Sequence, residues 1–304
     1  MQEERARGCL VGFAVGDALG APLAFIKAEQ VRIKHGVVRE MIGGGWLGLR
    51  SGATSGETAQ MRALAETLRD GAEYDAAAAA AAYIDWLRTD PVDAPNLTRL
   101  ALEAIAEGAE PAEAARRAHE LSQEKTADNA TLGRCVPLAL RYAGAALAGH
   151  AAGDARLTHH APEAAGGSAG LCLLLSVLLA GEDDFDAARR AAEEGIADWG
   201  DGLPIVLRAT DGVPRSNLRP THDVIDTLEA ALWCATHGKD FETALVEAVN
   251  LGGSAATIGA VAGALRGARD GIDAIPERWL RVLQDRLIHD RLASKIAAHF
   301  VVSS

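Results

Sequence analysis

The chain has 304 residues, of which 49% are hydrophobic and only 4% aromatic, and its formal net charge at pH 7 is −12. We expect no nucleic-acid partner, because nucleic-acid binding needs clustered Lys and Arg. We also expect no membrane partner, because the chain shows no signal peptide and no uninterrupted apolar stretch of about 18 residues. The cysteines are far apart without a CxxC pair, which is typical of reduced thiols in a cytoplasmic protein. They are Cys9, Cys135, Cys172 and Cys234.

The apolar pattern is helical over most of the chain. Much of the apolar content is alanine, which favours helix, and no alternation is long enough to predict a strand. No linker and no clean repeat divides the sequence. We therefore predict that residues 1–304 form a single all-α, multi-helix globular domain. Helices are predicted at 5–20, 58–70, 74–89, 95–107, 111–122, 131–148, 162–180, 185–197, 222–237, 241–250, 255–268 and 276–300.

The first predicted helix carries glycines at four-residue spacing, Gly8, Gly12 and Gly16. Such spacing lets a second helix approach closely. Gly20 is predicted to be the residue just past the helix end. Asp17 interrupts the apolar pattern, and a buried carboxylate is costly unless it is paired or hydrogen-bonded. Asp17 is therefore either a cap for the next turn or a functional residue.

Two other acidic residues lie where helices are predicted to begin. Glu57 follows Ser55 in the first turn of a helix, with Ser55 as the predicted N-cap. Asp93 is predicted to be the N-cap of the helix near residue 95. By themselves these positions indicate only helix capping.

Several polar residues in the middle of the chain have two interpretations each. Adjacent His159 and His160 are either a polar loop or metal ligands that lack a third partner at ligand spacing. Arg134 either holds a phosphate bidentately or pairs with a carboxylate. The segment from Trp199 to Pro220 contains prolines and glycines and is predicted to be a long surface loop, which is often functional.

Near the C-terminal end, Gly252, Gly253 and Ser254 form a small polar turn that opens a Gly- and Ala-rich helix. A turn of this kind aims backbone N–H groups and short side chains at one point, where an anion or a metal can bind. The alternative is a tight helix–helix contact. No nucleophile elbow, Walker motif or Rossmann fingerprint is present elsewhere.

Taken in order, these motifs resemble the ADP-ribosylglycohydrolase family, and most of all its bacterial dinitrogenase-reductase-activating branch. The resemblance implies an all-α fold and removal of ADP-ribose from protein side chains or related acceptors, by cutting an N- or O-glycosidic bond. It also implies two Mg²⁺ or Mn²⁺ ions held by carboxylates at the mouth of a cleft. The motifs run from about Arg5 to Arg286: Gly16-Asp17-Ala18-Leu19-Gly20, Gly43-Gly44-Gly45-Trp46, Pro91-Val92-Asp93, Asn129 to Pro137, Thr158-His159, Gly252-Gly253 through Gly267, and Ile275-Pro276-Glu277-Arg278-Trp279.

The departures from the family pattern lie at the family's metal and substrate ligands. Family members usually carry Thr-Asp-Asp-Thr where this chain has Ser55-Gly56-Glu57-Thr58. They carry Gly-Gly-Asp-x-Asp-Thr where it has Gly252-Gly253-Ser254-Ala255-Ala256-Thr257. The family's acidic residue after the first glycine motif falls in Leu23-Ala24-Phe25, and its Asn-Gly segment for ribose or phosphate reads Asn129-Ala130.

The departures leave too few charges for two dications. Mg²⁺ needs near-octahedral oxygen ligands and is not held by hydroxyls alone. Two neighbouring dications need several carboxylates to offset their repulsion. Of the polar residues at these positions, Ser55, Ser254 and Thr257 carry no charge, so Glu57 and Asp93 supply at most two negative charges. We therefore expect the two Mg²⁺ ions of the family to be lost, and no other cofactor.

We predict a repurposed, metal-independent hydrolase of an N-glycosidic bond in an ADP-ribosyl or ribosyl-type substrate, with Asp93 and Glu57 as acid and base. One alternative is an inactive family member that binds ADP-ribosyl groups or a regulatory protein partner. Another is a helical scaffold whose cleft is packed shut by apolar side chains. In the family, the loop that corresponds to Trp199 to His222 helps cover the nucleotide. In this chain the loop departs from the family pattern, and Asp223 follows it. An acidic residue there would suit a cationic or hydroxyl-rich ligand. The predicted substrate-binding residues are Asp17, Ser55, Asn129, Arg134, His159, Asp223, Gly252, Gly253, Ser254 and Thr257.

Overall fold

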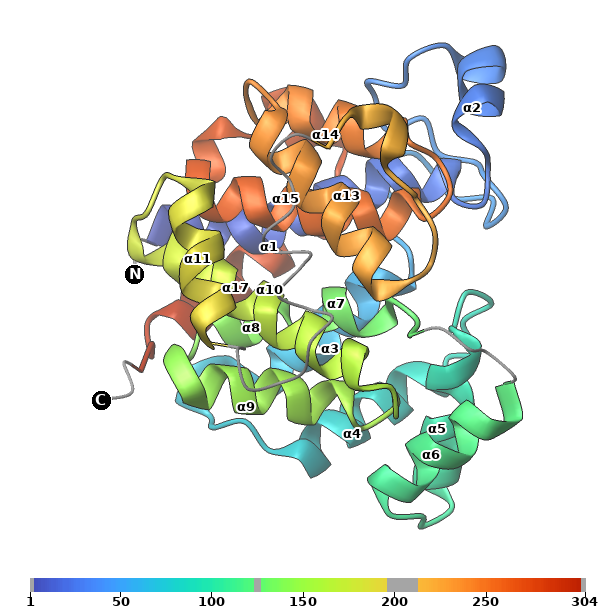
Figure 1. Ribbon diagram of the computed structural model, residues 1–304, viewed down its shortest axis with the longest axis vertical. Coiled ribbons are helices and arrows are strands. Elements are labelled where there is room, and N and C mark those ends of the chain that lie inside the picture. The colour runs from blue at the N-terminus through green and yellow to red at the C-terminus, as the bar shows by residue number, and fades with distance from the viewer. Residues whose placement is uncertain (1–2, 123–126, 196–212, 302–304) are drawn as a thin grey trace.

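The computed structural model describes residues 3–122, 127–195 and 213–301, and this part of the chain is built from helices without a named strand (Figure 1). The predicted all-α fold class is thereby confirmed. The α-helices are α1 Glu3–Gly20, α2 Ala28–His35, α3 Gly56–Leu68, α4 Ala76–Leu87, α5 Asn96–Ala106, α6 Pro111–Ser122, α7 Ala130–Arg134, α8 Val136–Ala139, α9 Gly144–Ala155, α10 Pro162–Ala180, α11 Phe185–Gly195, α13 Val224–His237, α14 Phe241–Val249, α15 Ala255–Asp270, α16 Glu277–Val282 and α17 Arg286–Ala297.

The centre of the fold is a close antiparallel pair, α1 against α15 (Figure 1). A Cβ added to Gly16 would lie 1.9 Å from the carbonyl oxygen of Gly259, and one added to Gly12 would lie 2.4 Å from that of Gly263. Such distances leave no room for any side chain, so the close approach predicted from the glycine spacing is confirmed. We call this contact the α1–α15 seam; its glycines are Gly8, Gly12 and Gly16 on α1 and Gly259, Gly263 and Gly267 on α15.

The α1–α15 seam decides where polar groups meet. Because the two helices are antiparallel, the C-terminal end of α1 lies beside the N-terminal end of α15, and Gly20 packs on the backbone of Ala255. Asp17, three residues before the end of α1, therefore lies at the same end of the seam as Ser254, the residue that precedes α15. Helices α5 and α6 project from the body as a hairpin, and α2 lies at the opposite end of the same side (Figure 1).

Helix α10 is almost wholly apolar and runs through the core. It is long and apolar enough by composition to cross a membrane, which differs from our expectation that no such stretch exists. In this fold 83% of its apolar window is buried inside the protein, as in a core helix. Its glycines and two serines had interrupted the apolar run in the sequence.

Helix ends differ from the predictions at three places. The predicted helix 131–148 is three helices, because Pro137 has no N–H to continue α7 and instead lies in the first turn of α8. The predicted helix 276–300 is α16 and α17, separated at Asp285, whose φ of 56° is left-handed. Gly20 is right-handed and leads into a 3₁₀ turn, so its prediction as the residue past the helix end was wrong. Helix α2 was missed because Val31 is its only buried residue.

Candidate functional site

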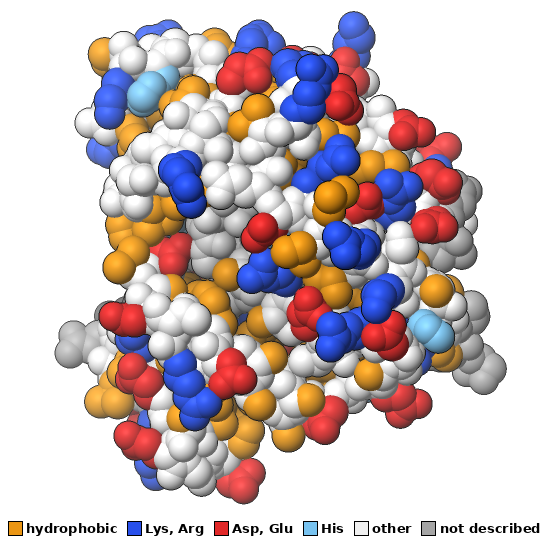
Figure 2. Space-filling model, turned by 180° about the vertical axis from the view of Figure 1, so that it is seen from behind, with side chains coloured by type: hydrophobic (Ala, Val, Ile, Leu, Met, Phe, Trp, Pro, Cys, Tyr) orange, Lys and Arg blue, Asp and Glu red, His pale blue; other side chains and the backbone are white. Residues whose placement is uncertain are grey.

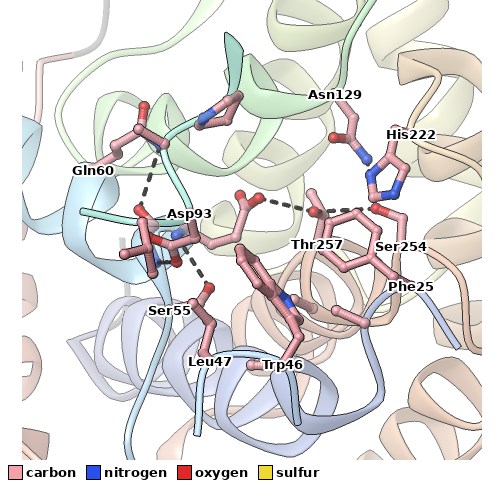
Figure 3. Close-up of a pocket in the computed structure, with 18 of the residues that line it drawn as sticks. Phe25, Trp46, Leu47, Ser55, Gln60, Asp93, Asn129, His222, Ser254 and Thr257 are labelled. Atoms are coloured by element: carbon pink, nitrogen blue, oxygen red, sulfur yellow. Dashed lines mark hydrogen bonds between the residues drawn. The ribbon is translucent and has the colours of Figure 1, made fainter. Parts of the chain in front are cut away.

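A cavity of about 400 Å³ lies at the end of the α1–α15 seam, where α3 and α15 begin (Figure 3). Ser55, Gln60 and Asp93 lie on one side of it, and Asn129, His222 and Ser254 on the other. Most of the lining side chains that carry polar atoms belong to helix starts or to the loops before them. They are Ser55, Glu57, Gln60, Asp93, Asp128, Asn129, His222, Ser254 and Thr257.

Asp17 holds the start of α3 and does not line the cavity. Its buried carboxylate accepts hydrogen bonds from the backbone N–H and the hydroxyl of Ser55, at 2.9 and 2.7 Å, and from those of Thr58, at 3.2 and 2.6 Å. Burial raises the pKa of Asp17, and these four hydrogen bonds act in the opposite direction. Ser55 also caps α3, as predicted, by accepting the N–H of Glu57. Asp17 is thus a positioning residue.

Asp93 also binds the start of α3. One of its carboxylate oxygens accepts the N–H of Gly56 at 2.6 Å, so the negative side chain lies at the positive end of the helix dipole. A Cβ added to Gly56 would lie 3.1 Å from the Asp93 carboxylate, which explains the glycine. The prediction that Asp93 caps the following helix was wrong: Pro95 precedes α5, with no side-chain cap.

A chain of hydrogen bonds crosses the cavity from Asn129 to Glu57. The Asn129 amide donates to the Ser254 hydroxyl at 2.8 Å, and that hydroxyl donates to the Thr257 hydroxyl at 3.3 Å. The Thr257 hydroxyl donates to Glu57 Oε1 at 2.9 Å (Figure 3). Asn129 is also bound to the Thr227 hydroxyl at 2.6 Å. The hydroxyls at the start of α15 are therefore held by neighbouring protein groups.

Glu57 is a protonated acid at neutral pH. Its Oε2 is buried without a protein partner. Burial raises the pKa of Glu57 to about 8; the charges of Asp17, Asp128 and Asp93 add to the rise, and the Thr257 hydrogen bond opposes it. The carboxylic acid can therefore donate a proton near pH 7, which suits a general acid.

Asp128 lines the cavity and was missed by the sequence analysis. Its Oδ1 accepts the N–H of Ala130 at 2.7 Å and lies 3.8 Å from His159 Nε2. Burial acts to raise the pKa of Asp128, but His159 and the Ala130 N–H outweigh it, so the pKa is lowered. The side chain stays 16% exposed. Its place just before Asn129 was the one signal available in the sequence.

Aromatic rings form one wall of the cavity, and these were also missed. The Phe25 and Trp46 rings meet edge to face with centroids 5.4 Å apart, and the His222 ring lies 4.9 Å from Phe25 (Figure 3). Phe25 is 62% exposed and Trp46 is 50% exposed, so their faces are open to a ligand. Burial lowers the pKa of His222, with Asp128 opposing, so this ring is neutral at pH 7. Trp46 lies in a quoted motif, but its partners come from distant loops.

The Gly252–Gly253 turn does not present free N–H groups to a ligand. The Gly253 N–H donates to the Ile26 carbonyl at 2.8 Å, and the Ser254 N–H donates to the Pro220 carbonyl at 2.9 Å. Both glycines have a positive φ, and a Cβ on either would collide with these same carbonyls. At Gly252 and Gly253 the turn is thus a tight packing contact, the alternative given for it, whereas the helix start that follows has no side-chain cap.

Other predicted binding residues lie behind or beside the cavity. Arg134 is fully buried in an ion pair with Asp154 at 2.8 Å, so it does not bind a phosphate here. Asp223 caps α13 by accepting two backbone N–H groups and does not line the cavity. His159 is buried behind Asp128. The predicted nucleotide-covering loop runs from Trp199 to His222, and its part up to residue 212 lies outside the described residues.

The comparisons with known proteins agree with this architecture. The family model for ADP-ribosylglycohydrolase matches residues 1–303. The chain belongs to the ADP-ribosylglycohydrolase family. It is 31% identical over 290 residues to the ADP-ribosyl-[dinitrogen reductase] glycohydrolase of Rhodospirillum rubrum, covering 92% of this chain and 90% of that one. It is 31% identical over 292 residues to the ADP-ribosylarginine hydrolase Tri1 of Pseudomonas putida (strain GB-1), covering 91% and 73%.

A solved structure shares the fold closely. The chain of an ADP-ribosylglycohydrolase-related protein complex superposes with a TM-score of 0.82 and 35% sequence identity, covering 98% of this chain and 99% of that one. The family resemblance implies two metal ions, which would need suitable ligands among the residues at this cavity.

The residues at the cavity do not fit a pair of dications. Within 3–122, 127–195 and 213–301, no three His, Cys, Asp or Glu side chains are grouped closely enough to hold a metal ion. The Ser254 and Thr257 hydroxyls are engaged in the hydrogen-bond chain, and Oε1 of Glu57 accepts the Thr257 hydroxyl. Asp93 shares its carboxylate with a backbone N–H. This donor set suits a hydrogen-bonded acid better than clustered cations.

Proposed function

We propose that the protein is a metal-independent hydrolase that cuts an N-glycosidic bond in a ribosyl or ADP-ribosyl-type substrate. Relatives whose names describe hydrolysis of ADP-ribosyl bonds support the reaction class. The observation that carries the proposal is the raised pKa of Glu57, about 8, in the same cavity as the Asp93 carboxylate. An acid and a base in one cleft are what glycoside cleavage requires.

Each group has a role in this reaction. Glu57 donates its proton to the leaving nitrogen, while the oxocarbenium-like ribosyl group gains positive charge at its anomeric carbon. The carboxylates of Asp93 and Asp128 stabilise that charge. Asp93 then takes a proton from the attacking water. Thr257 orients Glu57 so that Oε2, the oxygen without a protein partner, faces its acceptor. No metal ion enters any step, and no other cofactor is proposed.

A second function is a non-catalytic binder of ADP-ribosyl groups or of a regulatory protein partner. The observation that favours it is the hydrogen-bond chain from Asn129 to Glu57, which occupies hydroxyls where the family places carboxylates. A polar, open cavity suits either function and argues against a closed helical scaffold. For both functions we propose a cytoplasmic location, in keeping with four buried free thiols.

Turnover in a chelator separates the two functions. Release of the leaving group from a panel of ribosides and ADP-ribosyl compounds is followed by chromatography in excess EDTA. We expect turnover that EDTA does not change, and a fall of about 100-fold or more in Asp93→Asn. The matched control is Asp90→Asn, whose side chain is 94% exposed. Turnover only after Mg²⁺ or Mn²⁺ is added would reject metal independence, and binding without turnover would favour the non-catalytic function.

A further inference from the structure

The backbone N–H groups at two of the helix starts around the cavity, those of α3 and α7, are occupied by protein acceptors. At the start of α3, Asp17 binds the N–H groups of Ser55 and Thr58, and Asp93 binds that of Gly56. Near α7, Asp128 binds the N–H of Ala130. Helix starts with free N–H groups are the usual place for a phosphate. At the starts of α3 and α7 carboxylates hold those positions, so a phosphate there would meet negative charge in place of a donor. The start of α15 has no side-chain cap, so exclusion of a phosphate rests on the charges of the lining side chains.

The side chains that line the cavity also disfavour a negatively charged ligand. The acidic lining residues are Asp93, Asp128 and Glu57, of which Glu57 keeps its proton at pH 7, and the described lining residues include neither Lys nor Arg. This bias is local, because Lys and Arg mingle with Asp and Glu over the back face of the molecule (Figure 2). A pyrophosphate would bring two further negative charges into this field, at a cost that rises as solvent is excluded.

The aromatic wall favours the opposite kind of ligand. Phe25 and Trp46 are half exposed or more and line the same cavity as the Asp128 carboxylate; the His222 ring, which feels the charge of Asp128, lies next to Phe25. A flat cation between an aromatic face and a carboxylate gains both a cation–π interaction and a Coulomb attraction. The cavity therefore has a place for a planar, positively charged ring.

We propose that this cavity selects a cationic N-riboside without phosphate groups, in which the ribosyl anomeric carbon is bonded to a positively charged aromatic nitrogen. The inference rests on the proposed hydrolase function and names its substrate class. Asp128 is the specificity-determining residue, and Phe25 and Trp46 hold the ring.

The chemistry of this substrate matches a site without metal ions. When the bond between the anomeric carbon and the ring nitrogen breaks, its electron pair returns to the nitrogen and the ring leaves as a neutral molecule. Water bonds to the anomeric carbon, and its proton passes to Asp93 and then to solvent. The leaving group needs no proton, so the proton of Glu57 contributes less for this class than for neutral leaving groups.

A matched ligand series tests the selection by isothermal titration. N-ribosylnicotinamide is the cationic probe, its reduced dihydropyridine form is the neutral isostere, and nicotinamide mononucleotide adds one phosphate to the cation. In the wild-type protein we expect the cation to bind about tenfold more tightly than either of the others. Tighter binding of the mononucleotide, of ADP-ribose or of the neutral isostere would overturn the inference.

Two variants locate the charge effect. Asp128→Asn keeps an acceptor for the Ala130 N–H, and we expect it to weaken the cation about tenfold and leave the neutral isostere unchanged. Asp85→Asn removes an equal charge from an exposed ion pair on α4 and should change neither ligand. Equal weakening of both ligands in Asp128→Asn would overturn the role of its charge. The wild-type series decides the inference even if a variant fails to fold.

Turnover separates this inference from the proposed function. Preferred binding of the cation without release of nicotinamide would keep the selectivity and reject the hydrolase. Hydrolysis of an ADP-ribosyl compound with no preference for the cation would keep the hydrolase and reject the selectivity. In Glu57→Gln, hydrolysis of inosine, whose leaving group is neutral, should fall at least tenfold more than hydrolysis of the cation. An equal fall for both would overturn the leaving-group argument.

Discussion

Along the α1–α15 seam the helices meet through glycines with no side chains between them, whereas at the end of the seam both helices bind the start of α3 through polar side chains, Asp17 to Ser55 and Thr257 to Glu57. In the seam, the residue type at each position is limited by whether a Cβ atom fits. At the cavity, each position is decided by which hydrogen bonds and charges it offers. The backbone frame can thus be kept while the chemistry at its end changes.

The largest expected effect is on the seam itself. In Gly16→Val the new Cβ would collide with the backbone of Gly259, which cannot move without separating α1 from α15. We expect a loss of about 4 kcal/mol or more in the free energy of unfolding, or no soluble protein. Chemical denaturation measures it. The matched control is Gly149→Ala in α9, where open space surrounds the site and we expect a gain of roughly 0.5–1 kcal/mol. A stable Gly16→Val protein would refute the seam as a steric constraint.

The next effect lies where the seam meets the cavity. Asp17→Asn keeps the size of the side chain, but an amide nitrogen would face the hydroxyls and N–H groups of Ser55 and Thr58. We expect a loss of roughly 2–4 kcal/mol in the free energy of unfolding, together with lower activity as the start of α3 shifts. Denaturation and turnover are measured on the same preparation. Wild-type stability with lost activity would instead make Asp17 a direct participant.

The pH dependence of stability reports on Glu57. Its folded-state pKa of about 8 lies above the unfolded value near 4.5, so the folded state binds the extra proton between these limits. Its contribution to stability is present below about pH 4.5 and is lost as pH rises through 8. We expect Glu57→Gln to remove this loss, with a gain on the order of 2 kcal/mol over wild type at pH 9 and little difference at pH 4.5. Thermal unfolding across pH measures both proteins, and parallel curves would show that Glu57 titrates normally.

The smallest effect lies at the aromatic wall. Trp46 is half exposed, so Trp46→Ala should change the free energy of unfolding by no more than about 0.5 kcal/mol. We expect the affinity for the cationic riboside to fall by about 1 kcal/mol, close to fivefold, through loss of the cation–π contact. Titration of wild type and variant measures this. The same loss for the neutral isostere would show that the wall supplies only apolar contact.

Local patterns in the sequence were sufficient for much of the fold. The all-α class, the extent of α10 and the close approach of α1 followed from apolar periodicity and glycine spacing, which are properties of a helix alone. Ser55 as a cap of α3 was also predicted, because a cap acts within one turn. Helix α2 escaped prediction, since a helix with one buried residue has no apolar period.

The cavity was predicted only in part. Ser55, Glu57, Asp93, Asn129, Ser254 and Thr257 were named beforehand and do line it. Arg134 follows the second of its two interpretations, pairing with a carboxylate, and Asp223 caps a helix. Sequence did not separate these roles from substrate binding, because a charged residue looks the same whether it meets a ligand, an ion-pair partner or a helix end. Phe25, Trp46, Asp128 and His222 come from separate loops, and no spacing along the chain shows that such residues share one wall.

By itself, the sequence determined that the chain is helical, that α1 can accept a close partner, and that few carboxylates remain at the family's metal positions. Each of these depends on residue type and on neighbours within a few turns. Only the tertiary structure decided that α15 is that partner and that Glu57 is buried enough to keep its proton near pH 7. It also decided that carboxylates take the N–H groups at the starts of α3 and α7. Burial and charge at a point depend on segments up to 200 residues apart, such as Glu57 and Thr257, which only folding brings together.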